Sequence, residues 1–157
     1  GYGSSLEDLY FPPDELYQKV KPFSDPFDFV ASDPTFETLK DGFHADMTRA
    51  REINPVLKAE KYAAFLFPCE SFSRRVSGVY SNQLARENPD RAHALASELP
   101  SGEYLISVRA PLSEKCGADE LCRQFPTGGG RKAAAGINSL PREDWPMFLE
   151  AMKKQFG

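Results

Sequence analysis

The most informative stretch of the sequence reads Thr127-Gly128-Gly129-Gly130-Arg131-Lys132-Ala133-Ala134-Ala135-Gly136. Its glycines let the backbone adopt positive φ angles and let another molecule approach without meeting a Cβ atom. Alanine has the highest helix propensity, so we expect the glycine loop to run into a short helix. Free N–H groups at a helix N-terminus, together with Arg131 and Lys132, suit an anion such as phosphate. A glycine-rich turn with solvated basic side chains is the alternative.

The composition is that of an ordinary globular protein with one domain. The chain has 157 residues, a net charge of −4 and three cysteines, which form no CxxC pair. A nucleic-acid coat protein would be strongly basic, and a disulfide scaffold would use its cysteines in pairs. The sequence shows no apolar run long enough to span a membrane and no secretory signal, so we expect a cytoplasmic protein. It begins with Gly1 rather than methionine, so we expect a further domain upstream.

The first half of the chain predicts an arm followed by a helix, a strand and a helix. Residues 1–33 are rich in proline and aromatic residues and are expected to pack on the core as an N-terminal arm. Apolar residues at steps of three and four predict helices over 34–53 and 71–88. The continuous apolar run over 62–67 is typical of a strand that is buried on both faces.

The second half of the chain predicts a hairpin, two helices and a further strand. Two strand-like segments, 91–99 and 103–109, flank a three-residue loop that contains glycine, which favours a β-hairpin. The apolar pattern over 117–125 predicts a two-turn helix. A short strand and a final helix are expected after Gly136.

This order of elements predicts a single α/β domain over 34–157, with a mixed central β-sheet and helices on both faces. The hairpin makes at least one strand pair antiparallel. Ser107 and Arg109 alternate with apolar residues in the second hairpin strand, so both point to one face of the sheet. We expect the glycine stretch to lie next to the strand ends, where α/β domains commonly bind ligands.

The run from Gly128 to Gly136 resembles the GGGHxxAAG signature of the DHH-associated C-terminal domain, which follows the catalytic domain in DHH-family phosphoesterases. Ser107-Val108-Arg109 is similar to the S-x-R sequence at the end of the strand before that motif. The resemblance is good over 91–157 and weaker over 34–90. The departure from the signature is Arg131, where the family usually has histidine.

The resemblance implies the substrate-binding half of a phosphoesterase, whose ligand is a phosphate-containing small molecule or a short oligonucleotide. It implies contacts to phosphate or sugar from the three glycines and Arg109. It also implies an upstream DHH catalytic half, in which several aspartates and a DHH triplet hold the Mn²⁺ or Mg²⁺ that activates water. Neither His44 nor His93 lies in such a triplet. We therefore predict no metal site and no phosphodiesterase activity in this chain alone.

The local chemistry of the glycine stretch and the family resemblance together indicate the candidate binding residues. Gly128, Gly129, Gly130 and Arg131 form the expected anion loop, which Arg109 and Ser107 approach from the neighbouring strand. Arginine can hold a phosphate bidentately but cannot shuttle a proton at neutral pH, so Arg131 favours binding over chemistry. Cations at a helix start oppose the helix dipole, which suggests another use for such a pair in the helix over 71–88. The supporting cations are Lys132, Arg74 and Arg75, and a solvated arginine pair is the alternative for the last two.

Two other classes of function are compatible with this sequence. The chain could be an interaction domain that docks on a partner domain or forms a homodimer through the hairpin edge and the aromatic arm. It could also be an acyltransferase-like domain that binds coenzyme A, which would need a pyrophosphate site at the glycine loop.

Overall fold

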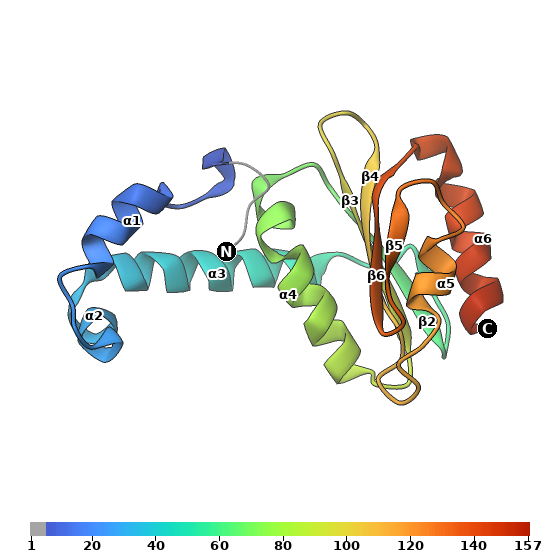
Figure 1. Cartoon of the computed structure of the whole chain (residues 1–157), viewed down its shortest axis with the longest axis horizontal. Helices are drawn as coiled ribbons and strands as arrows, with labels where there is room; N and C mark the ends of the chain where they lie inside the picture. The colour runs from blue at the N-terminus through green and yellow to red at the C-terminus, as the bar shows by residue number, and fades with distance from the viewer. Residues whose placement is uncertain (1–5) are drawn as a thin grey trace.

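The computed structural model describes residues 6–157 and contains one α/β domain built on a six-stranded mixed sheet (Figure 1). The strand order is β1-β2-β3-β4-β6-β5; β2 and β3 are parallel and the other pairs are antiparallel. Helices lie on both faces, so the predicted fold class is confirmed. The strands are β1 (Leu57–Lys58), β2 (Tyr62–Phe67), β3 (Ala92–Glu98), β4 (Tyr104–Arg109), β5 (Gly128–Arg131) and β6 (Ala134–Leu140). The helices are α1 (Pro13–Val20), α2 (Pro26–Ser32), α3 (Pro34–Glu52), α4 (Ser71–Glu87), α5 (Ala118–Cys122) and α6 (Trp145–Phe156), with short 3₁₀ turns η1 (Leu6–Asp8) and η2 (Arg142–Asp144).

Aspartate caps and prolines set the starts of α2 and α3. The Asp25 and Asp33 carboxylates each accept a hydrogen bond of 2.8 Å from a backbone N–H two residues further on. A proline then occupies the first turn of each helix, where its missing N–H leaves no unmet bond. The hydrogen bond from Thr35 also lowers the pKa of Asp33. The helix predicted over 34–53 is confirmed, and Pro26–Ser32, within the expected N-terminal arm, is a helix of seven residues.

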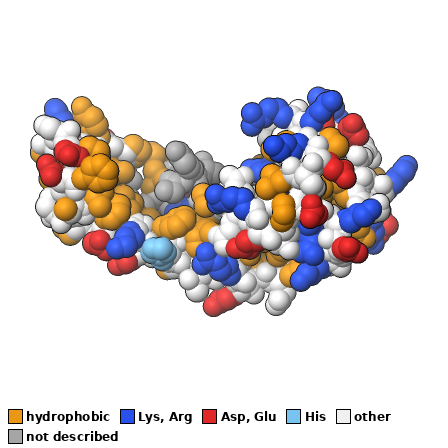
Figure 2. All heavy atoms as spheres, turned by 90° about the horizontal axis from the view of Figure 1, so that it is seen from below, with side chains coloured by type: hydrophobic (Ala, Val, Ile, Leu, Met, Phe, Trp, Pro, Cys, Tyr) orange, Lys and Arg blue, Asp and Glu red, His pale blue; other side chains and the backbone are white. Residues whose placement is uncertain are grey.

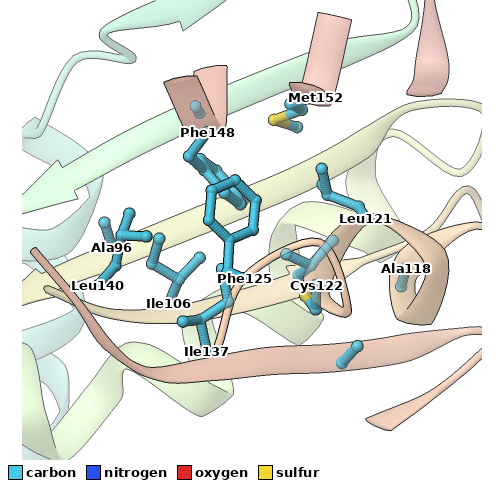
Figure 3. Packing of buried hydrophobic residues seen from close by; sticks show 14 of the residues in the cluster. Ala96, Ile106, Ala118, Leu121, Cys122, Phe125, Ile137, Leu140, Phe148 and Met152 are labelled. Carbon is cyan, nitrogen blue, oxygen red and sulfur yellow. The ribbon is translucent and has the colours of Figure 1, made fainter. Parts of the chain in front are cut away.

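The sheet separates two apolar cores. On one face, α3 and α4 cover β2 and β3, and buried Phe65, Phe67 and Leu95 meet side chains of both helices. On the other face, α5 packs on β5 and β6 and α6 reaches β2, and Phe148 and Phe125 lie against Ile137 and its neighbours (Figure 3). The helix predicted over 117–125 is shorter than expected, since α5 ends at Cys122 and the following turn still buries Phe125.

The prediction of a short helix after the glycines is wrong. Gly128–Arg131 forms strand β5, the chain turns at Lys132 and Ala133, and Ala134–Leu140 returns as β6. The high helix propensity of the alanines is overridden because β6 pairs with both β4 and β5 and thereby satisfies its backbone hydrogen bonds on both edges. The candidate anion site therefore cannot depend on a helix N-terminus at this place.

The N-terminal elements project away from the sheet along the first half of α3 (Figure 1). Several of their apolar side chains are exposed, including Tyr17 at 59% and Phe27 at 77%. Figure 2 shows hydrophobic side chains gathered over that end of the molecule. Residues 1–5 of the expected arm lie outside the described residues, and the boundary between residues 33 and 34 stays a prediction.

A buried histidine makes the stability of the domain depend on pH. His93 in β3 is 2% exposed, and its Nδ1 atom has no hydrogen-bond partner among residues 6–157. Burial lowers the pKa of His93 from 6.5 to about 4, and the charge of Arg91 contributes. The unfolded chain therefore binds this proton at a higher pH than the folded chain does. Above pH 6.5 His93 therefore does not lower the free energy of unfolding. As the pH drops to 4, protonation of His93 in the unfolded chain lowers it by about 3 kcal/mol.

Replacing His93 with leucine should remove this part of the pH dependence, because no proton is then taken up on unfolding. Urea unfolding at several pH values between 7 and 4 measures it. Relative to the wild type, His93→Leu should gain about 3 kcal/mol of unfolding free energy over that interval. His44 is exposed on α3, and His44→Leu serves as the matched control. Parallel pH profiles for the wild type and His93→Leu would contradict the account.

Candidate functional site

The register of three neighbouring strands places two arginines in one row. Arg109 of β4 pairs with Ala134 of β6, and Ala134 pairs with Arg131 of β5. Directly paired residues of antiparallel strands point to the same face of the sheet. This face is the one that α4 covers over β3, but it is open over β5 and β6 (Figure 1). We call Arg109, Ala134 and Arg131 the arginine row.

A nearly bare floor lies beside the arginine row. Two residues further along each strand on the same face, Ser107 pairs with Gly136, and Gly136 pairs with Gly129. A hollow of about 350 Å³ opens above this part of the sheet, and Thr127 and Asn138 lie at its far end. We call it the glycine hollow. Its floor offers backbone rather than side chains, so a flat ligand group can approach closely.

The four glycines of the motif differ in whether the fold could accommodate a side chain at their positions. A Cβ atom at Gly128 would collide with the backbone carbonyl of Cys122 in α5, and a Cβ at Gly136 would lie 2.7 Å from the carbonyl oxygen of Ile106. Gly130 has a φ of +142°. Gly129 alone of these four has open space where its Cβ would be and no positive φ.

Arg109 is held in place by α4. Its Nε–H donates to the Asn82 side-chain oxygen at 2.9 Å, and its Nη1 donates to the Val108 carbonyl at 3.2 Å. Burial lowers the pKa of Arg109, and the nearby charge of Arg131 lowers it further. Asn82 was not among the predicted residues, because nothing in the sequence connects two positions that lie 27 residues apart.

A second hollow, of about 390 Å³, lies between α4 and the end of β4. It is lined by Arg109 and by one side of α4 that includes Gly78, Val79 and Asn82. We call it the α4 hollow. The arginine row lies next to both hollows, because Arg109 lines this one, and Gly129 and Gly136, two residues along the strands from the row, line the glycine hollow.

The charges of the arginine row have no ion-pair partner within the described residues. Neither Arg109 nor Arg131 comes within 4.0 Å of a carboxylate there. Arg131 and Lys132 are exposed at the tip of the β5–β6 hairpin, and Arg109 and Ser107 are half-buried. Two cations that repel each other and lack counter-charges favour an anion between or above them.

Arg74 and Arg75, the other predicted cations, carry buried ion pairs at the start of α4. Arg74 donates to both carboxylate oxygens of Asp8, at 2.8 and 2.6 Å. Arg75 donates to both oxygens of Asp46 at 2.6 and 2.8 Å and to the backbone carbonyl of Asp8 at 2.8 Å. These carboxylates raise the pKa of each arginine. Both arginines line the α4 hollow, so a role in binding stays a prediction, but most of their donors are already used.

The same ion pairs dock the N-terminal segment. The Tyr10 ring lies 4.6 Å from the Arg75 guanidinium and packs directly on Gly42, where a Cβ atom would collide with it. Glycine at position 42 therefore allows the Tyr10 ring to pack closely on α3. The contacts of Asp8 and Tyr10 together hold η1 against α3 and α4.

Within residues 6–157, no three or more His, Cys, Asp or Glu side chains gather as a metal site would require. In the same part of the chain, none of the helices is both long enough and apolar enough to cross a membrane.

No protein-family model matches this sequence, and no curated protein matches it. Solved structures do share its fold. RecJ from Thermus thermophilus in complex with Mg²⁺ aligns with a TM-score of 0.59 and 20% identity, over 84% of this chain and 21% of RecJ. The C-Ala domain of Aquifex aeolicus alanyl-tRNA synthetase aligns with a TM-score of 0.51 and 15% identity, over 66% of this chain and 98% of that domain. The pGpG-specific phosphodiesterase PggH from Vibrio cholerae aligns with a TM-score of 0.52 and 14% identity, over 93% of this chain and 46% of PggH.

These alignments establish the fold of the chain but do not establish its function. The chain spans nearly all of the C-Ala domain but less than half of RecJ and of PggH. One fold thus occurs in part of a synthetase and in part of a phosphodiesterase. Its function must therefore be argued from particular residues.

The ion pair between Arg75 and Asp46 should matter for folding. Both side chains are largely buried, so Asp46→Ala would leave the Arg75 charge without its carboxylate. We expect the free energy of unfolding, measured with urea, to fall by about 3 kcal/mol. Asp41→Ala, at an exposed position of the same helix, is the matched control and should change it by less than about 0.5 kcal/mol. Equal stability of the two variants would show that the pair does not hold η1 and α3 on α4.

Proposed function

We propose that this chain is the substrate-binding domain of a DHH-type phosphoesterase and that it holds the phosphate of a nucleotide or short oligonucleotide at the arginine row. The observation that carries the proposal is the pairing register, which sets Arg109 and Arg131 on one open face, where neither has a carboxylate partner among residues 6–157. The shared fold with RecJ and PggH and the GGGR run support it. Because PggH is a pGpG-specific phosphodiesterase, pGpG is a suitable probe.

The two arginines differ in how far their side chains are oriented before the phosphate binds. Arg109 is half-buried and held by Asn82, so its remaining donors are already oriented. Arg131 is exposed and loses more side-chain freedom when it binds. An arginine stays charged at all physiological pH values and can hold two phosphate oxygens at once. Arg131, in the place of the motif's usual histidine, therefore acts as a binding group and not as a proton donor or acceptor.

The proposal assigns the hydrolytic chemistry to a catalytic half outside these 157 residues. In that half, Mn²⁺ or Mg²⁺ would activate the attacking water, as the resemblance to DHH phosphoesterases implies. The exposed apolar side chains of α1 and α2 would face that half, since RecJ and PggH are more than twice as long as this chain. The three free cysteines fit the cytoplasmic setting that we propose for it.

Arg131→Ala and Arg109→Ala should each weaken pGpG binding by about 1.5–3 kcal/mol, because each removes charge-assisted hydrogen bonds to phosphate. Isothermal titration calorimetry on the full chain measures the loss. Binding to the wild type should also weaken as the salt concentration rises. Lys154→Ala removes an exposed cation on α6, far from the arginine row, and should leave the affinity unchanged.

Three outcomes would count against the proposal. Unchanged affinity in both arginine variants would remove the arginine row from the site. A wild-type chain that forms a stable dimer by light scattering and binds no pGpG would support an interaction domain instead. Binding of coenzyme A in preference to pGpG would support the acyltransferase-like alternative.

The chain alone should show no phosphodiesterase activity, because the proposed metal site belongs to the catalytic half. The assay is release of p-nitrophenol from bis-p-nitrophenyl phosphate with Mn²⁺ present, run beside pGpG hydrolysis followed by chromatography. Hydrolysis that depends on Mn²⁺ would place catalytic residues within this chain and overturn the assignment.

A further inference from the structure

The described glycines divide into those that the fold requires and those that it does not. Glycine is required where a Cβ atom would collide with a neighbour or where φ is positive. By these two criteria the required glycines are Gly42, Gly102, Gly117, Gly128, Gly130, Gly136 and Gly157. Among the glycines of residues 6–157, only Gly78 and Gly129 have neither a positive φ nor any atom within 4 Å of the Cβ position.

Gly78 is unfavourable for the fold that contains it. It lies in the middle of the 17-residue helix α4, where only proline is a worse choice. Its position is exposed, and a Cβ atom there would have no atom of the described residues within 4 Å. The packing of α4 therefore does not account for a glycine at this position.

Gly78 and Gly129 each line one of the two hollows beside the arginine row. Gly129 lies in the floor of the glycine hollow, and Gly78 lines the α4 hollow with Arg109. Asn82, which holds Arg109, follows Gly78 by one turn of the helix. The two hollows have similar volumes, about 350 and 390 Å³, and the arginine row lies next to both.

Building on the proposed function, we propose that the two hollows receive the two nucleosides of a dinucleotide whose linking phosphate lies at the arginine row. Gly129 admits one nucleoside over the sheet, and Gly78 admits the other against the backbone of α4. Gly78 is thus a specificity-determining residue that lets the site take a ligand longer than a mononucleotide. A mononucleotide needs only the phosphate contacts and the glycine hollow.

The test compares GMP and pGpG by calorimetry on the full chain and its variants. Gly78→Leu fills the α4 hollow, so its affinity for pGpG should fall about tenfold or more, while its affinity for GMP should change less than about twofold. Gly129→Leu should weaken both ligands. Gly78→Ala should raise Tm by about 2–4 °C, since alanine is the better helix former, and this checks that the position is not needed for folding.

Ala45→Leu adds the same side chain at an exposed position of α3, outside both hollows, and should change neither affinity. Unchanged pGpG affinity in Gly78→Leu would overturn the inference while leaving the proposed function intact. If Gly78→Leu loses the same affinity for GMP and for pGpG, the contact with Gly78 involves the part that the two ligands share. That result would also overturn the inference. If the wild type binds neither ligand while Tm shows it folded, the proposed function fails, and this inference fails with it.

Discussion

The close pairing of β4 with β6 is the constraint on which the open face depends. Gly136 lies opposite Ser107, and even a methyl group at Gly136 would press on the carbonyl oxygen of Ile106. This contact keeps β6 in register with β4, and β5 follows because β6 is its only sheet partner within residues 6–157. A one-residue shift would turn Arg131 toward the core face, since the side-chain period of a strand is two. The alignment of Arg131 with Arg109 is thus a consequence of backbone packing.

The arginines of the site region fall into two groups with opposite electrostatic roles. Arg74 and Arg75 are paired with buried carboxylates, so their charges stabilise the docking of the N-terminal segment. Arg109 and Arg131 have no such partners in the described chain, and Arg131 lowers the pKa of Arg109. Folding leaves this second pair of charges uncompensated, and a bound anion would relieve their repulsion. The contrast explains why we place the phosphate on the sheet rather than at the start of α4.

The sequence predicted the elements whose patterns are local. The apolar run of β2, the periodicity of α3 and the loop between β3 and β4 each determine their structure within a few residues. The helix expected from Ala133 to Ala135 was wrong because a distant strand, β4, pairs with that segment. Likewise, the contacts of Asn82 with Arg109 and of Arg74 with Asp8 join residues 27 and 66 positions apart. No local pattern encodes such contacts, so the residues that complete the site emerged only from the fold.

The central claim is that the arginine row and the glycine floor bind phosphate-containing ligands. An NMR titration of the ¹⁵N-labelled chain with pGpG tests it most directly, because it locates the ligand without altering a residue. The account predicts the largest amide shifts at Gly129, Gly130 and Arg131, with smaller ones at Gly78 and Asn82. The competing surface is the hollow near the C-terminus, which Glu114 and Phe156 line. Shifts confined to that hollow, with none in β5, would contradict the account.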